Sequence, residues 1–172
     1  MIAMSSTRSS DLSSRLIIDA SPLIILFKAE FSHLLPEMFD ELYVPDAVWN
    51  EIMAGPEDDV ARQNLPTFSQ IKRVTILTVS TEVIRFDLGS GESESIELAL
   101  DTPDAKLLID DAAGRICARR SGLSILGTGA LLVLAKKNGL IPSVIRALQT
   151  VRASGLWVDV SVTRTLIERA GE

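Results

Sequence analysis

The chain has 172 residues, 47% of them hydrophobic, which suits one domain with a substantial core and excludes a disordered chain. Its net charge of −6 argues against broad, non-specific nucleic-acid binding, which usually needs a basic surface, but is compatible with an acidic metal pocket. The single cysteine, Cys117, excludes an internal disulfide, and no apolar run approaches the roughly 18 residues of a membrane helix. We therefore expect a cytoplasmic protein with no membrane segment.

The start of the chain, residues 1–14, is rich in serine and lacks the apolar stretch of a signal peptide, so we expect a flexible tail. In the first half, the pattern predicts a strand over 15–19, a helix over 20–30, a helix or turn over 31–40, a strand over 41–45, a helix over 46–53, a loop or poorly ordered helix over 55–69 and a strand over 71–80. In the second half, it predicts a loop over 86–92 leading into a helix to 101, a strand over 106–110, a helix over 112–122 and a strand over 123–127. Helices over 128–139 and 141–155, a strand over 156–161 and a final helix over 162–172 follow. This alternation is typical of a mostly parallel sheet covered on both faces, and it predicts one α/β domain over 15–172.

Several helix ends have their own signals. Ser21 followed by Pro22 predicts an N-cap with proline at the first helical position. Asp46 is the expected N-cap of the helix over 46–53. Gly122 and Gly139 are expected just past the ends of two later helices.

Acidic residues stand where predicted strands end. Asp19 closes the first predicted strand, and Asp110 and Asp111 close the strand of the segment LLIDD. Because ligands bind at the carboxyl ends of the strands in open parallel sheets, these side chains are candidates for one site. Two further acids, Glu51 and Glu94, lie on predicted helices that can border the same edge.

Carboxylates gathered without histidine or cysteine suit a hard cation such as Mg²⁺ or Mn²⁺, which takes oxygen ligands and often keeps several waters. Like charges a few ångströms apart are costly unless some are protonated or a cation compensates them. A metal held there would activate a water and stabilise the charge that builds on a phosphate during in-line displacement.

Each acid also has a purely structural interpretation. Asp19 could cap the next helix, and Glu51 could lie on a solvated helix face. Glu92 and Glu94 are both first-turn acids that the helix dipole favours, and we take Glu94 as the better candidate for a ligand.

The adjacent aspartates pose a similar choice. We expect one of Asp110 and Asp111 to cap the following helix and the other to face the metal, and we favour Asp111 for the metal. The only histidine, His33, lies in a helical pattern, and we interpret it as a structural or surface residue rather than a catalytic one.

The order of these segments resembles the PIN domain family. LIIDASPLIIL resembles the opening of PIN domains, with a strand, an aspartate, a small residue, a serine and an apolar helix. VPDAVWNEI resembles their second block, with a glutamate a few residues into a helix. GSGESESIELAL, LLIDDAAGRICARRSGLSILGTGALLVLAKKNGLI and GLWVDVSVTRTLIERAGE resemble blocks of one prokaryotic branch. The resemblance covers almost everything from Arg15 onward.

The resemblance implies a three-layer α/β/α fold with a mostly parallel central sheet. Many PIN domains are Mg²⁺- or Mn²⁺-dependent ribonucleases, and many in prokaryotes are toxins of VapC-type toxin–antitoxin pairs, so it implies an RNA substrate, an antitoxin protein and a homodimer. The catalytic residues implied by position are Asp19, Glu51, Glu94 and Asp111. The implied metal ligands are Asp19, Glu94, Asp110 and Asp111. Ser21 and Thr128 are implied beside the site, toward the substrate or the metal ligands, although Thr128 equally suits a helix N-cap.

Two features depart from the usual toxin pattern. Glu94 stands where an aspartate is usual, and its longer side chain could move the metal or leave it bound through water. The fourth acid follows the sequence I-D-D rather than a T-x-D strand end. These departures leave the expected fold intact and bear on the chemistry of the site.

Two other functions compete with a nuclease. A non-catalytic module would keep the fold and use its acidic surface to bind a basic partner segment or a second copy. A phosphatase or receiver-like phospho-acceptor also carries strand-end aspartates, but no lysine follows LSILG until Lys136, inside a helix, which disfavours it. For a nuclease, substrate contact would fall to Lys28, Arg115, Arg119 and Arg120, of which the last two better suit a solvated helix face.

Overall fold

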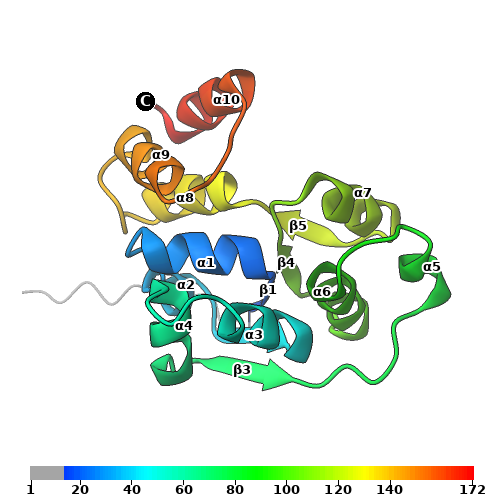
Figure 1. Ribbon diagram of the computed structural model, residues 1–172. Helices are drawn as coiled ribbons and strands as arrows, with labels where there is room; N and C mark the ends of the chain where they lie inside the picture. Colours follow the sequence, from blue (N-terminus) through cyan, green and yellow to red (C-terminus); the bar gives the residue numbers. More distant parts are fainter. Residues whose placement is uncertain (1–13) are drawn as a thin grey trace, which may run out of the picture.

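A parallel sheet forms the centre of the protein. The computed structural model describes residues 14–172, so residues 1–13 of the expected tail lie outside the described part. Five parallel strands follow the order β3-β2-β1-β4-β5 (Figure 1). They are β1 (Arg15–Ile18), β2 (Glu41–Pro45), β3 (Ile71–Val74), β4 (Lys106–Leu108) and β5 (Ser124–Leu126). The predicted α/β class and parallel sheet are confirmed.

Helices cover both faces of this sheet, and α8, α9 and α10 form a group beside α1 (Figure 1). They are α1 (Ala20–Lys28), α2 (Leu34–Met38), α3 (Asp46–Met53), α4 (Val60–Asn64), the 3₁₀ turn η1 (Leu65–Thr67), α5 (Thr81–Ile84), α6 (Ser90–Asp101), α7 (Ala112–Arg120), α8 (Thr128–Lys137), α9 (Val144–Ala153) and α10 (Val160–Ala170). None of the helices within residues 14–172 is long and apolar enough to cross a membrane.

The three layers follow from the alternation of side chains along the strands. Leu16 and Ile18 of β1 point to one face and pack with α1 residues such as Leu26. Ile17, between them, points to the other face and packs with Ile96 of α6 and with α7. Because both faces are apolar, helices must cover both, and the three-layer α/β/α fold results.

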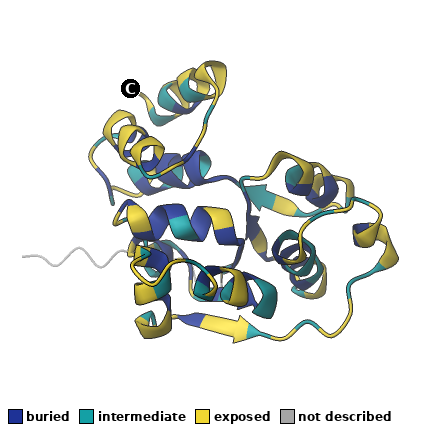
Figure 2. Ribbon diagram, in the orientation of Figure 1, coloured by how far each residue is buried: buried dark blue, intermediate teal, exposed yellow. Residues whose placement is uncertain are grey.

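The last three helices form a cluster of their own beside α1. Leu132 of α8, Leu148 of α9 and Leu166 of α10 share one apolar core, which also includes Ile25 of α1. Figure 2 shows that α1 and α8 are largely buried, whereas α9 and α10 expose their outer sides. This core anchors the C-terminal helices to the sheet through α1.

Some predicted boundaries are wrong. Asp19, not Ser21, occupies the N-cap position of α1, because the strand passes directly into the helix. Pro45, not Asp46, is the N-cap of α3. The strand predicted over 71–80 ends at Val74, which pairs with Pro45; beyond this point β2 has turned into α3 and offers no partner.

The strand predicted over 156–161 is also wrong. The side chain of Asp159 accepts hydrogen bonds from the backbone and hydroxyl of Ser161 and so starts α10. Trp157, in the same segment, is 83% exposed and packs into no sheet. By contrast, Gly122 and Gly139 have positive φ just past α7 and α8, as their positions predict.

Candidate active site at the carboxyl end of the sheet

The carboxyl ends of β1 and β4 form the natural ligand-binding edge of this sheet. From β1 the chain runs to β2 on one side, and it later returns through α6 to β4 on the other side. The strand order therefore reverses between β1 and β4, where open α/β sheets bind their ligands. Asp19 follows β1 and Asp110 follows β4, as the sequence predicts.

Asp19 is the buried centre of this edge, with a residue exposure of 1%. Its backbone N–H donates to the carbonyl of Leu108, which fixes it against β4. The Ser95 hydroxyl lies 3.4 Å from its Oδ1. Burial, followed by the charges of Glu92 and Glu51, raises the pKa of Asp19 to about 7. The carboxylate is thus held in a place that disfavours its charged form.

Glu51 and Glu92 complete a group that we call the acid cluster: Asp19, Glu51 and Glu92. Glu51 projects from α3 and Glu92 from the first turn of α6, and both line a cleft of about 780 Å³ between these helices. Partial burial and the charge of Glu92 raise the pKa of Glu51. Three carboxylates from distant parts of the chain therefore influence one another at this edge.

Gly91 makes this close approach feasible. A Cβ atom at Gly91 would lie 2.9 Å from Glu51 Oε2 and 3.7 Å from Asp19 Oδ1. The missing side chain leaves room for both carboxylates beside the backbone of α6. Gly91 is the second residue of α6 and does not have a positive φ. The position therefore uses glycine for its small size and not for an unusual backbone angle.

Glu94, the preferred candidate on α6, has another partner. Its Oε2 accepts a hydrogen bond of 2.9 Å from the backbone N–H of Ala47. This N–H belongs to the first turn of α3, where no intrahelical acceptor is available. Glu94 lines the same cleft as Glu92, but here it caps α3 from outside.

The adjacent aspartates of LLIDD each start a helix. Asp111 is the N-cap of α7, and its Oδ2 accepts a bond of 2.7 Å from Gly114 N. Asp110 accepts bonds of 2.8 Å and 2.6 Å from the backbone N–H and hydroxyl of Thr128, at the start of α8. Burial raises the pKa of Asp110, and these bonds partly offset the rise. The structure thus places Asp110, rather than Asp111, against the buried edge.

The two hydroxyl candidates differ in environment. Ser21 is exposed on the first turn of α1. Thr128 is fully buried and holds Asp110, so it contacts an acid of the edge directly. His33 is exposed and bonds the carbonyl of Glu30, which agrees with its interpretation as a surface residue.

The acid cluster has the right chemistry for a hydrated divalent cation. In residues 14–172, no three side chains of His, Cys, Asp or Glu are arranged to hold a metal directly. Mg²⁺, however, usually binds through one or two carboxylates and keeps several waters. No lysine or arginine of the described residues is among the groups that shift the pKa of Asp19 or Glu51. A cation would relieve this unbalanced charge, so the donor set fits the ion.

The sequence favours Glu94 over Glu92 as a ligand, whereas in the structure the charge of Glu92, and not that of Glu94, is among the groups that raise the pKa of Asp19. One signal was available: Glu92 and Ser95 are three residues apart, so they share one face of α6. That face meets Asp19, as the bond from Ser95 shows. The side of α6 that carries Glu94 meets α3 instead.

Comparison with known proteins adds the family. A family model described as a PIN domain matches residues 15–172. A search of curated proteins finds no match. The matched range spans the whole sheet, all its helices and the acidic edge. The chain therefore belongs to the PIN domain family.

Proposed function

We propose that this protein is a metal-dependent endoribonuclease that hydrolyses phosphodiester bonds at the acid cluster. The PIN domain is a nuclease-type fold, which indicates nucleic acid as the ligand. The observation that carries the proposal is Asp19. A buried carboxylate facing two other carboxylates costs stability, and a chain keeps such an arrangement where a cation or a reaction uses it.

The proposed site assigns a role to each acid. Asp19 and Glu51 would hold Mg²⁺ or Mn²⁺ directly or through water, and Glu92 would hold its water ligands. The bound ion would supply an activated water and stabilisation for the charge that builds on the phosphate. Ser95 orients Asp19 through its hydroxyl.

In this proposal the remaining predicted ligands support the acid cluster and do not contact the metal. Glu94, Asp110 and Asp111 position α3, α8 and α7 around the cluster through their backbone bonds. Thr128 holds Asp110 in place. Ser21 is exposed near Asp19 in the chain and is available to a substrate.

The wider expectations from the sequence belong to the same proposal. We propose RNA as the substrate, a role as the toxin of a toxin–antitoxin pair, a homodimer, a cytoplasmic location and one domain over residues 15–172. The acidic net charge of −6 favours an antitoxin segment that is basic.

Titration calorimetry with Mn²⁺ and Mg²⁺ tests the site first. We expect the wild-type protein to bind either ion, Asp19→Asn to lose binding, and Asp101→Asn to retain it. Asp101 is a matched control because it is exposed at the far end of α6. Cleavage of a labelled single-stranded RNA should follow the same pattern.

One further outcome would favour the non-catalytic module. Three of the candidate acids already serve as helix caps, and this arrangement alone needs no metal. A wild-type protein that binds neither ion, cleaves no RNA with metal present and forms a stable complex with a basic protein partner would replace the nuclease by that module.

A further inference from the structure

Arg115 lies at the acidic edge, one strand beyond Asp110. It projects from α7 toward Gly127, the residue between β5 and α8. A Cβ atom at Gly127 would lie 2.5 Å from Arg115 Nη1 and 3.3 Å from Asp110 Oδ1. The guanidinium and the carboxylate therefore flank the same glycine, and the glycine leaves room for the guanidinium.

Asp110 takes its side-chain hydrogen bonds from Thr128 and none from Arg115. Both oxygens of Asp110 already accept bonds from Thr128. Arg115 lowers the pKa of Asp110 through its nearby charge, and its guanidinium forms no hydrogen bond or ion pair with any residue from 14 to 172. The residue is half-buried, so its position is restricted.

Two other basic residues of the chain have partners. Arg73 pairs with Asp46, bonds Asn50 and lies over the ring of Trp49. Lys28 pairs with Asp59 at 2.9 Å. Arg115 differs from both because its guanidinium has no such partner, which is the condition of a group that binds an external anion.

Strand spacing places this cation near the acid cluster without neutralising it. Asp19 follows β1 and Arg115 reaches the end of β5, two strands away. Neighbouring strands lie about 4.8 Å apart, so the separation is on the order of 10 Å. One phosphate of a single strand can occupy the acid cluster while another phosphate contacts Arg115.

We propose that Arg115, in the space left by Gly127, binds a backbone phosphate of RNA that flanks the bond to be cleaved. Arginine suits this role because its planar donors match two phosphate oxygens at once. The inference rests on the proposed function for the identity of the ligand. Arg115 is a binding residue here, and the acid cluster remains the place of chemistry.

RNA binding in an Asp19→Asn background, without metal, separates this role from catalysis. Affinity for a labelled single-stranded RNA is measured at several salt concentrations. Arg115→Gln should lower it about tenfold and reduce the slope of log K against log salt by about 0.7, the value for one lost phosphate contact. Arg119→Gln removes the same charge from an exposed position on the same helix and should change affinity less than twofold.

Two further variants keep the test independent of folding defects. Arg115→Lys should restore the salt slope but only part of the affinity, because lysine keeps the charge and loses the paired geometry. Gly127→Ala leaves every charge in place and should weaken binding by displacing the guanidinium. Circular dichroism and thermal unfolding confirm that each variant is folded.

The outcomes distinguish this inference from the proposed nuclease. RNA binding that depends on Arg115 in a protein that never cleaves RNA would support the inference and reject the nuclease. Metal-dependent cleavage with equal RNA affinities for Arg115→Gln and Arg119→Gln would support the nuclease and reject the role of Arg115. Absence of RNA binding by the parent protein would overturn the inference.

Discussion

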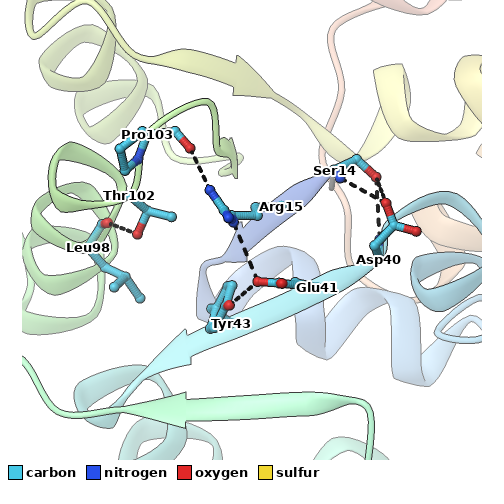
Figure 3. A network of polar contacts seen from close by, with 8 residues as sticks. All are labelled: Ser14, Arg15, Asp40, Glu41, Tyr43, Leu98, Thr102 and Pro103. Carbon is cyan, nitrogen blue, oxygen red and sulfur yellow. Dashed lines mark hydrogen bonds and ion pairs between the residues drawn. The ribbon is translucent and has the colours of Figure 1, made fainter. Parts of the chain in front are cut away.

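The acidic residues at the two ends of strand β1 have opposite electrostatic surroundings. At the amino end, Arg15 lies 3.5 Å from Glu41 and donates to the carbonyl of Pro103, while the Tyr43 hydroxyl also donates to Glu41 (Figure 3). These contacts, above all the one from Tyr43, lower the pKa of Glu41. At the carboxyl end, Asp19 faces other acids and its pKa rises to about 7.

The difference shows which end serves the fold and which is a candidate for function. Donors and cations satisfy the acids of the amino end, including Asp40, which accepts from Ser14. The acid cluster is a local conflict that the rest of the fold must stabilise. Such conflicts concentrate at functional sites, because binding or catalysis uses the unsatisfied groups.

The largest expected effect concerns Asp19 and pH. Because its pKa is about 7 in the fold and 3.8 without perturbation, the native state binds more protons between these values, and stability falls as pH rises from about 4 to 7. In EDTA, we expect this group to make the protein on the order of 3 kcal/mol less stable at pH 8 than at pH 5. Urea unfolding at both pH values measures the change.

Asp19→Asn provides the control for that comparison. The substitution should remove most of this pH dependence and raise stability at pH 8, while RNA cleavage falls about 100-fold or more. Mn²⁺ should stabilise the wild-type protein at pH 8 and leave Asp19→Asn unchanged. A variant as sensitive to pH as the wild type would contradict the assigned pKa.

Thr128→Val tests the stability contributed by an acid that caps a helix, Asp110, at the same edge as the acid cluster. Thr128 is fully buried, and its hydroxyl donates to Asp110 at 2.6 Å. Loss of this bond leaves a buried carboxylate oxygen without a partner, so we expect a loss of about 1–3 kcal/mol in unfolding free energy. Thr128→Ser, which keeps the hydroxyl, should retain more of the stability. Equal losses in both variants would show that packing, not the bond, is decisive.

A smaller effect is expected at Glu172, an acid whose surroundings are the opposite of those of Asp19. Its carboxylate accepts from the backbone of Val144, the hydroxyl of Ser143 and the backbone of Ile145, and it pairs with Lys136. These donors lower its pKa to about 2. Its contribution to the stability of the folded state is therefore present above about pH 4.5 and is lost as pH falls toward 2.

Glu172→Gln should therefore lower the melting temperature slightly at pH 7 and have no effect near pH 2. Differential scanning calorimetry at both pH values measures the difference. Glu168→Gln, on the exposed side of α10, is the matched control and should leave the melting temperature unchanged at either pH. Equal behaviour of the two variants would show that the bonds to α9 carry no stability.

The smallest effect is expected from Glu41→Gln at the amino end of the sheet. Glu41 is in an ion pair near the surface, and such pairs contribute little. Metal binding and RNA cleavage should match the wild type. A loss of cleavage comparable to that of Asp19→Asn would break the contrast between the two ends of β1.

Much of the fold was predictable from local patterns. The apolar runs of β1, β4 and β5 and the glycines after α7 and α8 act within a few residues, so the sequence reveals them directly. The position of Asp19 and Asp110 at one edge also follows, because parallel strands bring their carboxyl ends together. The end of β3 could not be predicted, since it depends on where its partner β2 turns.

The direction of each acidic side chain was decided by the tertiary structure alone. Glu92 and Glu94 have almost the same local sequence, yet the charge of one raises the pKa of Asp19 and the other caps α3, because α6 packs against both β1 and α3. Asp110 caps a helix that begins 18 residues later, a partner that no local pattern reveals. The sequence determined that carboxylates gather at this edge. Packing between distant elements decided which of them receive hydrogen bonds and which remain in the acid cluster.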